Sequence, residues 1–147
     1  MEIPYTLVID NLTEFSVCYF KDKNHHAQAP PHFFVVIPIA DARNLVISII
    51  TSKVEKRARF YDEKGQSSLV GVSPRNLCCL SKDSIVDCNQ AEALSKRELL
   101  SRVDPTRGFR IGASGDQIDP SLKERILNAI KSSPNVKPYI KEYLKNR

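Results

Sequence analysis

NLVISIITS, the segment from Asn44 to Ser52, is a run of β-branched and aliphatic residues that ends in two hydroxyl side chains. Its apolar residues are too continuous for a strand with one exposed face, so the segment is predicted to be a strand buried on both faces. A second apolar run, FFVVI at residues 33–37, precedes it across a polar connection of hairpin length at residues 41–44. We therefore expect the two strands to pair at the centre of a small β-barrel or a strongly bent sheet.

The C-terminal end of the strand predicted at residues 44–52 is a candidate site. Thr51 and Ser52 are expected to emerge into solvent from a buried strand, which fixes their position. Small polar side chains placed in this way are suited to binding or catalysis. The alternative interpretation is that the two hydroxyls only end the strand.

Length and composition favour one globular domain. The chain has 147 residues, of which 41% are hydrophobic and 27% charged. No apolar run approaches the roughly 20 residues that cross a bilayer, and the N-terminus MEIPYTLVID lacks the basic start of a signal peptide. We expect a cytoplasmic protein without a membrane association. The formal net charge of +5 is compatible with an acidic partner, either a nucleic acid or an acidic protein.

Strands are predicted first along the chain and helices last. Further strands are expected at residues 15–20, 68–72, 77–80 and 84–88, with a loop at 21–31 and an irregular, glycine-containing loop at 104–117. Ser95 and Glu98 have the spacing of a capping box and start a helix at 96–103. Asp119 and Pro120 start a helix at 120–132, and a last helix covers about 137–146. The fold class is α+β, mostly β, in a single domain at 1–147, with six or seven strands at about 13–92.

Residues 53–61 combine basic and aromatic side chains. The combination suits a surface that follows the backbone of a single-stranded nucleic acid and stacks on its bases. It equally fits an exposed strand whose lysines discourage edge pairing. The side chains concerned are Lys53, Lys56, Arg57, Arg59, Phe60 and Tyr61.

Neither the cysteines nor the histidines have the spacing of a metal site. The cysteines lack the C-x-x-C pairs of zinc sites, and two of them lie in apolar runs, so buried reduced thiols are favoured. The histidines have no acidic or cysteine partner at a matching interval, so exposed loop histidines are favoured over metal ligands. No metal or cofactor is therefore expected. The residues are Cys18, Cys78, Cys79, Cys88, His25, His26 and His32.

The order of the segments resembles the MazF/PemK family. Members of this family are SH3-like antiparallel barrels that act as the toxins of bacterial toxin–antitoxin pairs and cut single-stranded RNA. The resemblance implies an SH3-like barrel with C-terminal helices, RNA as the substrate, a cognate antitoxin protein as a partner, and a homodimer. It covers roughly residues 15–132 and is carried by FSVCYF, PHFFVVIPI, ISIITS, IVDCNQ, LSKRELL and SLKERILNAI.

Three positions that the family uses for RNA cleavage differ in this chain. The arginine that begins the family's second strand is replaced by His32, the late-strand arginine aligns with Asp87, and the late-strand aspartate aligns with Asn89. An asparagine cannot act as a general base, and Asp87 repels phosphate charge that an arginine would stabilise. The positions that remain are Thr51 and Ser52, which line the RNA-binding surface in the family, and Gln90.

A rearranged site could still cut RNA without a metal. In this hypothesis His32 acts as acid or base with Asp87 as its orienting carboxylate, and Arg57 or Arg59 supplies the cation. His25 and His26 are alternates for proton transfer, because the family's first loop hangs over the active surface. The candidate catalytic residues are His32, Thr51, Ser52, Asp87 and Asn89, and the candidate RNA-binding residues are Lys53, Lys56, Arg57, Arg59, His25, His26 and Gln90. The alternatives are a barrel that binds nucleic acid or protein without chemistry, and an unrelated α+β domain.

Overall fold

The structure is a computed structural model that describes residues 4–39 and 43–145. Its strands are β1 (Ser16–Phe20), β2 (His32–Pro38), β3 (Asn44–Thr51), β4 (Leu69–Val72), β5 (Ser84–Asp87), β6 (Glu92–Ser95) and β7 (Phe109–Ala113). Its α-helices are α1 (Tyr5–Asp10), α2 (Val54–Phe60), α3 (Glu63–Gln66), α4 (Lys96–Arg102), α5 (Pro120–Ser132) and α6 (Pro138–Tyr143). Three 3-10 turns are η1 (Cys88–Gln90), η2 (Pro105–Arg107) and η3 (Gly115–Gln117). None of the described helices is long and apolar enough to cross a membrane.

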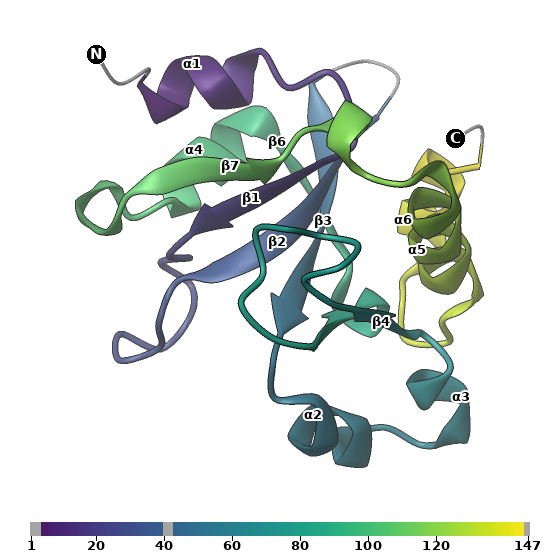
Figure 1. Cartoon of the computed structure of the whole chain (residues 1–147). Coiled ribbons are helices and arrows are strands. Elements are labelled where there is room, and N and C mark those ends of the chain that lie inside the picture. The colour runs from purple at the N-terminus through teal and green to yellow at the C-terminus, as the bar shows by residue number, and fades with distance from the viewer. Residues whose placement is uncertain (1–3, 40–42, 146–147) are drawn as a thin grey trace.

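The central strand of the sheet is β3 (Figure 1). It pairs antiparallel with β2 along one edge, where Phe34 lies opposite Ile49. On its other edge, β5 pairs with the end of β3 at Thr51 and β6 pairs with its beginning, and η1 connects these two partners. The predicted pairing of residues 33–37 with 45–50 is confirmed. Residues 41 and 42 of the predicted hairpin connection lie outside the described part of the chain.

The sheet is open in the described part of the chain. Its strand order is β4-β5-β3-β2-β1-β7, with β6 beside β3, and no described pairing joins β4 to β7. An α+β fold with a seven-stranded antiparallel sheet and packed helices is therefore confirmed, whereas a closed barrel is not.

Both faces of the sheet are buried, as the continuous apolar run of β3 predicted. Val46 of β3 lies in a core that includes Ile126 of α5. Ile47, the next residue, points to the opposite face and lies in a second core that includes Leu99 of α4. Figure 1 shows α5 and α6 on one side of the sheet and α1 and α4 on the other.

Residues 54–60 form helix α2, so the interpretation of this stretch as an exposed strand is wrong. None of its side chains is buried, and a strand needs one face packed on a core to be stable. Its Glu, Lys, Arg and Ala residues favour a helix when packing does not decide.

Residues 104–117 are not an irregular loop throughout, because they contain β7, which pairs with β1. The glycines in this segment led to the prediction of a loop instead of a strand. A Cβ atom on Gly112 would lie 2.8 Å from the ring of Phe33, so close packing requires the glycine there. Gly108 turns the chain into β7 with a φ of 80°.

One further predicted strand is absent, and two segments form elements for which no prediction was made. Residues 77–80 form turns instead of a strand, although Leu77 and Leu80 are buried in the core beneath α5. Residues 5–10 form α1, and residues 92–95 form β6. Short apolar runs do not distinguish these alternatives, because tertiary contacts decide them.

The later helices follow their capping signals. The Ser95 hydroxyl accepts from the Glu98 amide at 3.0 Å, and the Glu98 carboxylate accepts from the Ser95 amide at 3.1 Å. The Asp119 carboxylate accepts from the Ser121 amide at the start of α5, where Pro120 is the first helical residue. The predicted helices at 96–103 and 120–132 are thereby confirmed to within a residue.

Candidate nucleic-acid interface

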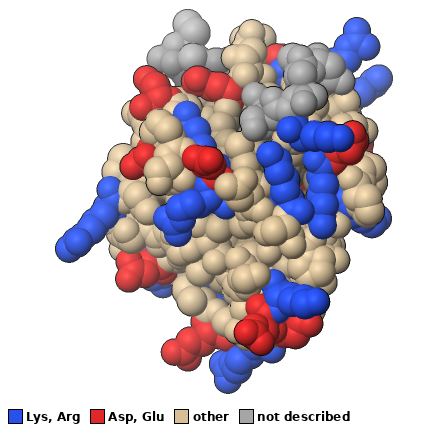
Figure 2. Space-filling view, turned by 90° about the vertical axis from the view of Figure 1, so that its right-hand side faces the viewer, with Lys and Arg blue, Asp and Glu red and all other residues tan. Residues whose placement is uncertain are grey.

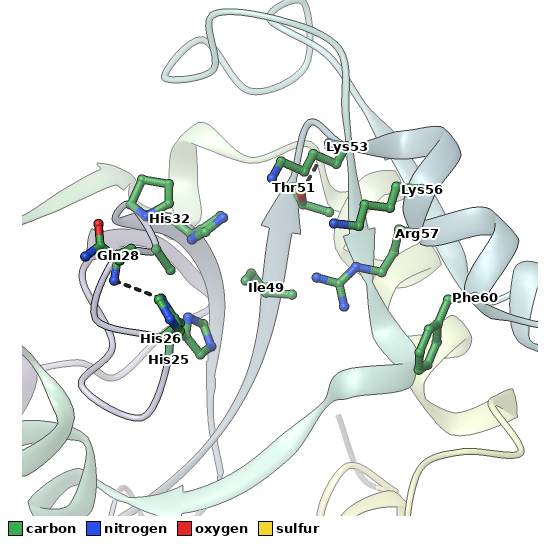
Figure 3. A pocket seen from close by; sticks show the side chains of 12 residues that line it. His25, His26, Gln28, His32, Ile49, Thr51, Lys53, Lys56, Arg57 and Phe60 are labelled. Carbon is green, nitrogen blue, oxygen red and sulfur yellow. Dashed lines mark hydrogen bonds between the residues drawn. The ribbon is translucent and has the colours of Figure 1, made fainter.

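A cavity of about 770 Å³ lies beside the first residue of β2 and the last residues of β3 (Figure 3). The loop at residues 21–31 forms one wall, α2 forms the opposite wall, and the two strands supply the floor. We call it the basic groove. Its lining residues are His25, His26, Gln28, Ala29, Pro30, His32, Ile49, Thr51, Lys53, Lys56, Arg57 and Phe60.

The alternation of side chains along the strands selects the floor of the basic groove. His32 and Thr51 line it, whereas Ser52 faces a separate cavity of about 200 Å³ beside Leu80 and Lys82. His32 borders both cavities. Thr51 also shapes the wall, because its hydroxyl accepts from the Lys53 amide at 3.2 Å at the point where β3 leads into α2.

The cations of α2 converge because of their helical spacing. Lys53, Lys56, Arg57 and Phe60 stand at positions i, i+3, i+4 and i+7, which lie on one side of a helix. Arg59 falls outside this side, and its Nε donates to the carbonyl of Glu55 at 3.4 Å. The structure therefore gathers three of the four predicted cations. Phe60 is 74% exposed at the edge of the groove, and its ring lies edge-on to that of Tyr61 at 5.1 Å between centroids.

No carboxylate is among the described residues that line the basic groove. On the side of the molecule that Figure 2 shows, where α5 and α6 lie, Lys and Arg side chains alternate with Asp and Glu. The groove is thus a local positive site rather than part of a uniformly positive surface.

A buried carboxylate anchors the histidine wall. Asp22 is 1% exposed, and its carboxylate accepts from the Arg102 guanidinium and from the Asn24 amide. Nε2 of His25 lies 3.8 Å from the same carboxylate. Burial would raise the pKa of Asp22, but the hydrogen bonds from Arg102 and Asn24 and the positive charges nearby outweigh it and lower the pKa.

His32 faces the loop histidines from the floor. Its ring centroid is 6.1 Å from that of His25, in an edge-on arrangement. Burial and the charges of His25, Arg57 and Lys21 lower the pKa of His32, and the carbonyl of Pro30 opposes this shift. Its Nδ1 is buried and forms no hydrogen bond of acceptable geometry within the described residues. The lowered pKa favours the neutral imidazole of His32, and its Nδ1 is buried away from the groove surface.

Asp87 does not lie where the carboxylate that orients His32 was expected. It is fully buried, and its carboxylate accepts from the Tyr61 hydroxyl at 2.9 Å and the Asn89 amide at 3.1 Å. Arg57 lies 3.3 Å from it. No described contact joins Asp87 to His32, and the carboxylate beside a groove histidine is Asp22 instead.

Gln90 extends this network to the surface of the protein. Its side-chain amide donates to the Tyr61 hydroxyl at 2.9 Å. Burial and the neighbouring Asp87 raise the pKa of Tyr61, against the effect of the bond from Gln90. The network holds Arg57 at the edge of the basic groove through Asp87.

Asn89 is occupied by bonds that hold the fold together. Its amide donates to the carbonyl of Gly65 at 2.7 Å, and its oxygen accepts from Ser133 at 2.6 Å and Asn135 at 3.1 Å. These bonds tie η1 to α3 and to the segment after α5. Asn89 is not a lining residue of the basic groove.

The cysteines take no part in the groove. Cys18 and Cys88 are fully buried free thiols, and burial raises the pKa of Cys18 to about 12. Within residues 4–39 and 43–145, no group of three or more His, Cys, Asp or Glu side chains could hold a metal ion.

No protein-family model and no curated protein gives a significant match to this chain. The resemblance to the MazF/PemK family therefore rests on the segments quoted above.

The sequence prediction missed Asp22, Glu92 and Arg102. Arg102 bridges the other two, and it stands 80 residues from Asp22 along the chain. No short-range pattern connects residues at such a separation. Phe60 and the cations of α2 were found from their composition, but their helical spacing was the stronger signal.

Proposed function

We propose that the basic groove binds single-stranded RNA through its phosphate backbone. The observation that carries the proposal is the wall of α2, where Lys53, Lys56 and Arg57 face one cavity without a carboxylate among its described lining residues. Clustered cations of this kind provide the electrostatic part of nucleic-acid binding. The opposite wall adds histidine nitrogens that can donate to phosphate oxygens.

Phe60 favours a single strand over a duplex. An aromatic residue that is 74% exposed beside the cations offers a surface on which an unstacked base can lie. Bases inside a duplex are already stacked on their neighbours, so they cannot use it.

The binding proposal is tested with a fluorescein-labelled single-stranded RNA and its duplex, followed by fluorescence anisotropy. Three phosphate contacts give a slope of log K against log salt concentration of about −2, since each contact on a single strand contributes about −0.7. The Lys53→Ala/Lys56→Ala variant should reduce the slope to about −0.7. The matched control is Lys123→Ala/Lys131→Ala on α5, which contributes no lining residue to the groove.

Two results would contradict the binding proposal. One is equal weakening by the groove pair and the control pair, which would indicate only a general effect of net charge. The other is a duplex that binds as tightly as the single strand, since that would leave Phe60 without a role.

A second candidate function is metal-independent cleavage of the bound strand, and the histidine arrangement favours it. In this proposal neutral His32 accepts the proton of the 2′-hydroxyl, and the 2′-oxygen forms a bond to phosphorus. The bond from phosphorus to the 5′-oxygen breaks, and protonated His25, oriented by Asp22, donates a proton to that oxygen. Arg57 stabilises the negative charge that develops on the phosphate. The products are a 2′,3′-cyclic phosphate and a free 5′-hydroxyl.

Cleavage is tested by mass spectrometry of the RNA after incubation with the purified protein in EDTA. A cyclic-phosphate end that disappears with His25→Ala and with His32→Ala, while Asn89→Ser retains it, supports this mechanism. Intact RNA at saturating protein leaves the protein as a binding module without chemistry.

The MazF/PemK resemblance extends the proposal to a cytoplasmic toxin with an SH3-like fold, which would act as a homodimer and be covered by an antitoxin protein. Growth arrest of a bacterium that expresses the chain alone, relieved by the Lys53→Ala/Lys56→Ala change, would support it. Unaffected growth at high expression would count against it.

A further inference from the structure

A second cavity, of about 260 Å³, adjoins the basic groove and shares His25, Ile49 and Arg57 with it. Its remaining lining differs in chemistry. Buried Phe34 and Ile47 supply an apolar side, and Asn24, Gln90 and Glu92 supply polar groups. The ion pair of Asp22 and Arg102 also lines it. We call it the side pocket.

The polar groups of the side pocket leave acceptors available. Oε1 of Glu92 pairs with Arg102, and Nε2 of Gln90 donates to the Tyr61 hydroxyl. Within residues 4–39 and 43–145, Oε2 of Glu92 and Oε1 of Gln90 have no hydrogen-bond partner. Both side chains are held by partners that are themselves fixed, because Arg102 also binds buried Asp22 and Tyr61 also binds buried Asp87.

The geometry points to the side pocket as a base-recognition site for a nucleotide whose phosphate lies in the basic groove, selective for bases that carry an exocyclic amino group. This inference rests on the proposed RNA binding. The apolar side packs against the face of the base, and the two free acceptors receive N–H groups from its edge. The pocket is large enough for one base.

Uracil fits this pocket poorly. Its O4 position is an acceptor, and at Glu92 it would face a carboxylate without a proton between them. The Arg102 guanidinium, which also lines the pocket, is already paired with Asp22 and Glu92. Cytosine places an amino group at the same position, and adenine and guanine also carry amino groups. Glu92 is half-buried, and a bound base would cover it further. A covered acceptor that finds no donor disfavours the wrong ligand by more than the loss of one hydrogen bond.

The test compares labelled hexacytidylate with hexauridylate, which differ at this edge of the base, by fluorescence anisotropy at fixed salt. We expect the wild-type protein to bind hexacytidylate about tenfold more tightly, the discrimination of one well-placed base contact. Glu92→Gln keeps the shape and an oxygen for Arg102, but it can turn an amide N–H toward O4 of uracil. It should bring the two affinities within about twofold while the salt slope stays unchanged.

Two further variants keep the test decisive. Gln90→Ala removes the second acceptor without touching Arg102, so it should reduce the preference even if Glu92→Gln lowers the melting temperature. Glu142→Gln, at an exposed position of α6, is the control and should leave the preference intact. Equal binding of the two oligonucleotides by wild type, or a preference that survives both pocket variants, overturns the proposed base recognition by the side pocket. The proposed RNA binding by the basic groove would then still stand. Absence of binding to either oligonucleotide overturns both proposals.

Discussion

Removal of the Asp22 charge is expected to destabilise the protein, because this carboxylate joins the loop at residues 21–31 to α4. Its side chain is fully buried, and it accepts two hydrogen bonds from Arg102 and one from the Asn24 amide. Breaking a buried ion pair usually costs about 3–5 kcal/mol. Arg102 keeps Glu92 as a partner, so we expect the low end, about 3 kcal/mol, for Asp22→Asn at pH 7.

The pH dependence gives a second measurement of the same interaction. The folded-state pKa of Asp22 lies below its ordinary value, so its contribution to stability is complete above about pH 4 and is lost as the pH falls through the folded-state pKa. Asp22→Asn has no proton to gain there. The difference between wild type and variant should therefore shrink from pH 5 toward pH 2.

Urea denaturation followed by circular dichroism at several pH values measures both effects. Asp83→Asn, an exposed position, is the matched control and should change the free energy of unfolding by less than about 0.5 kcal/mol. A loss for Asp22→Asn that is no larger than that of the control, or that grows as the pH falls, would refute the assignment of Asp22 as the charged anchor of the loop.

Three other changes follow from single contacts. Gly112→Ala should cost about 1–3 kcal/mol in urea denaturation, since its Cβ would press on the Phe33 ring at 2.8 Å, whereas Gly71→Ala has open space and should cost little. The wild-type protein should lose stability as the pH falls below about 6.5, because His32 binds a proton more readily in the unfolded chain than in the folded protein. The His32→Gln variant should lose less stability over this pH range. A pH profile of unfolding free energy that is the same in wild type and variant would contradict the lowered pKa of His32. Asn89→Ala should lower the free energy of unfolding by about 3 kcal/mol, because three hydrogen bonds are lost. Under conditions in which the variant is folded, its RNA affinity should equal that of wild type. Weaker RNA binding by the folded variant would show that Asn89 belongs to the RNA-binding site.

Local patterns in the sequence predicted the centre of the fold. A strand buried on both faces needs an uninterrupted apolar run, and Ile47 and Val46 of β3 do point into two different cores. The capping residues Ser95 and Asp119 likewise marked real helix starts. These signals work because each depends on residues within a few positions of one another.

The remaining features depend on contacts that a single segment does not encode. Gly112 was interpreted as loop-forming, although its role is to let β7 approach Phe33. Asp87 was expected near His32, but strand pairing turns it toward Tyr61. The α2 helix was missed because none of its side chains is buried, so the segment has no helical periodicity of apolar residues.

The location of bound RNA is the most direct test of the basic groove. A single-stranded RNA containing 5-bromouridine is crosslinked to the protein by ultraviolet light, and the attached residues are identified by mass spectrometry. We predict crosslinks at Phe60 and at peptides from the loop at residues 21–31, with their loss in the Lys53→Ala/Lys56→Ala variant. Crosslinks confined to Tyr139 and Tyr143 of α6, whose side chains are also exposed, would contradict it.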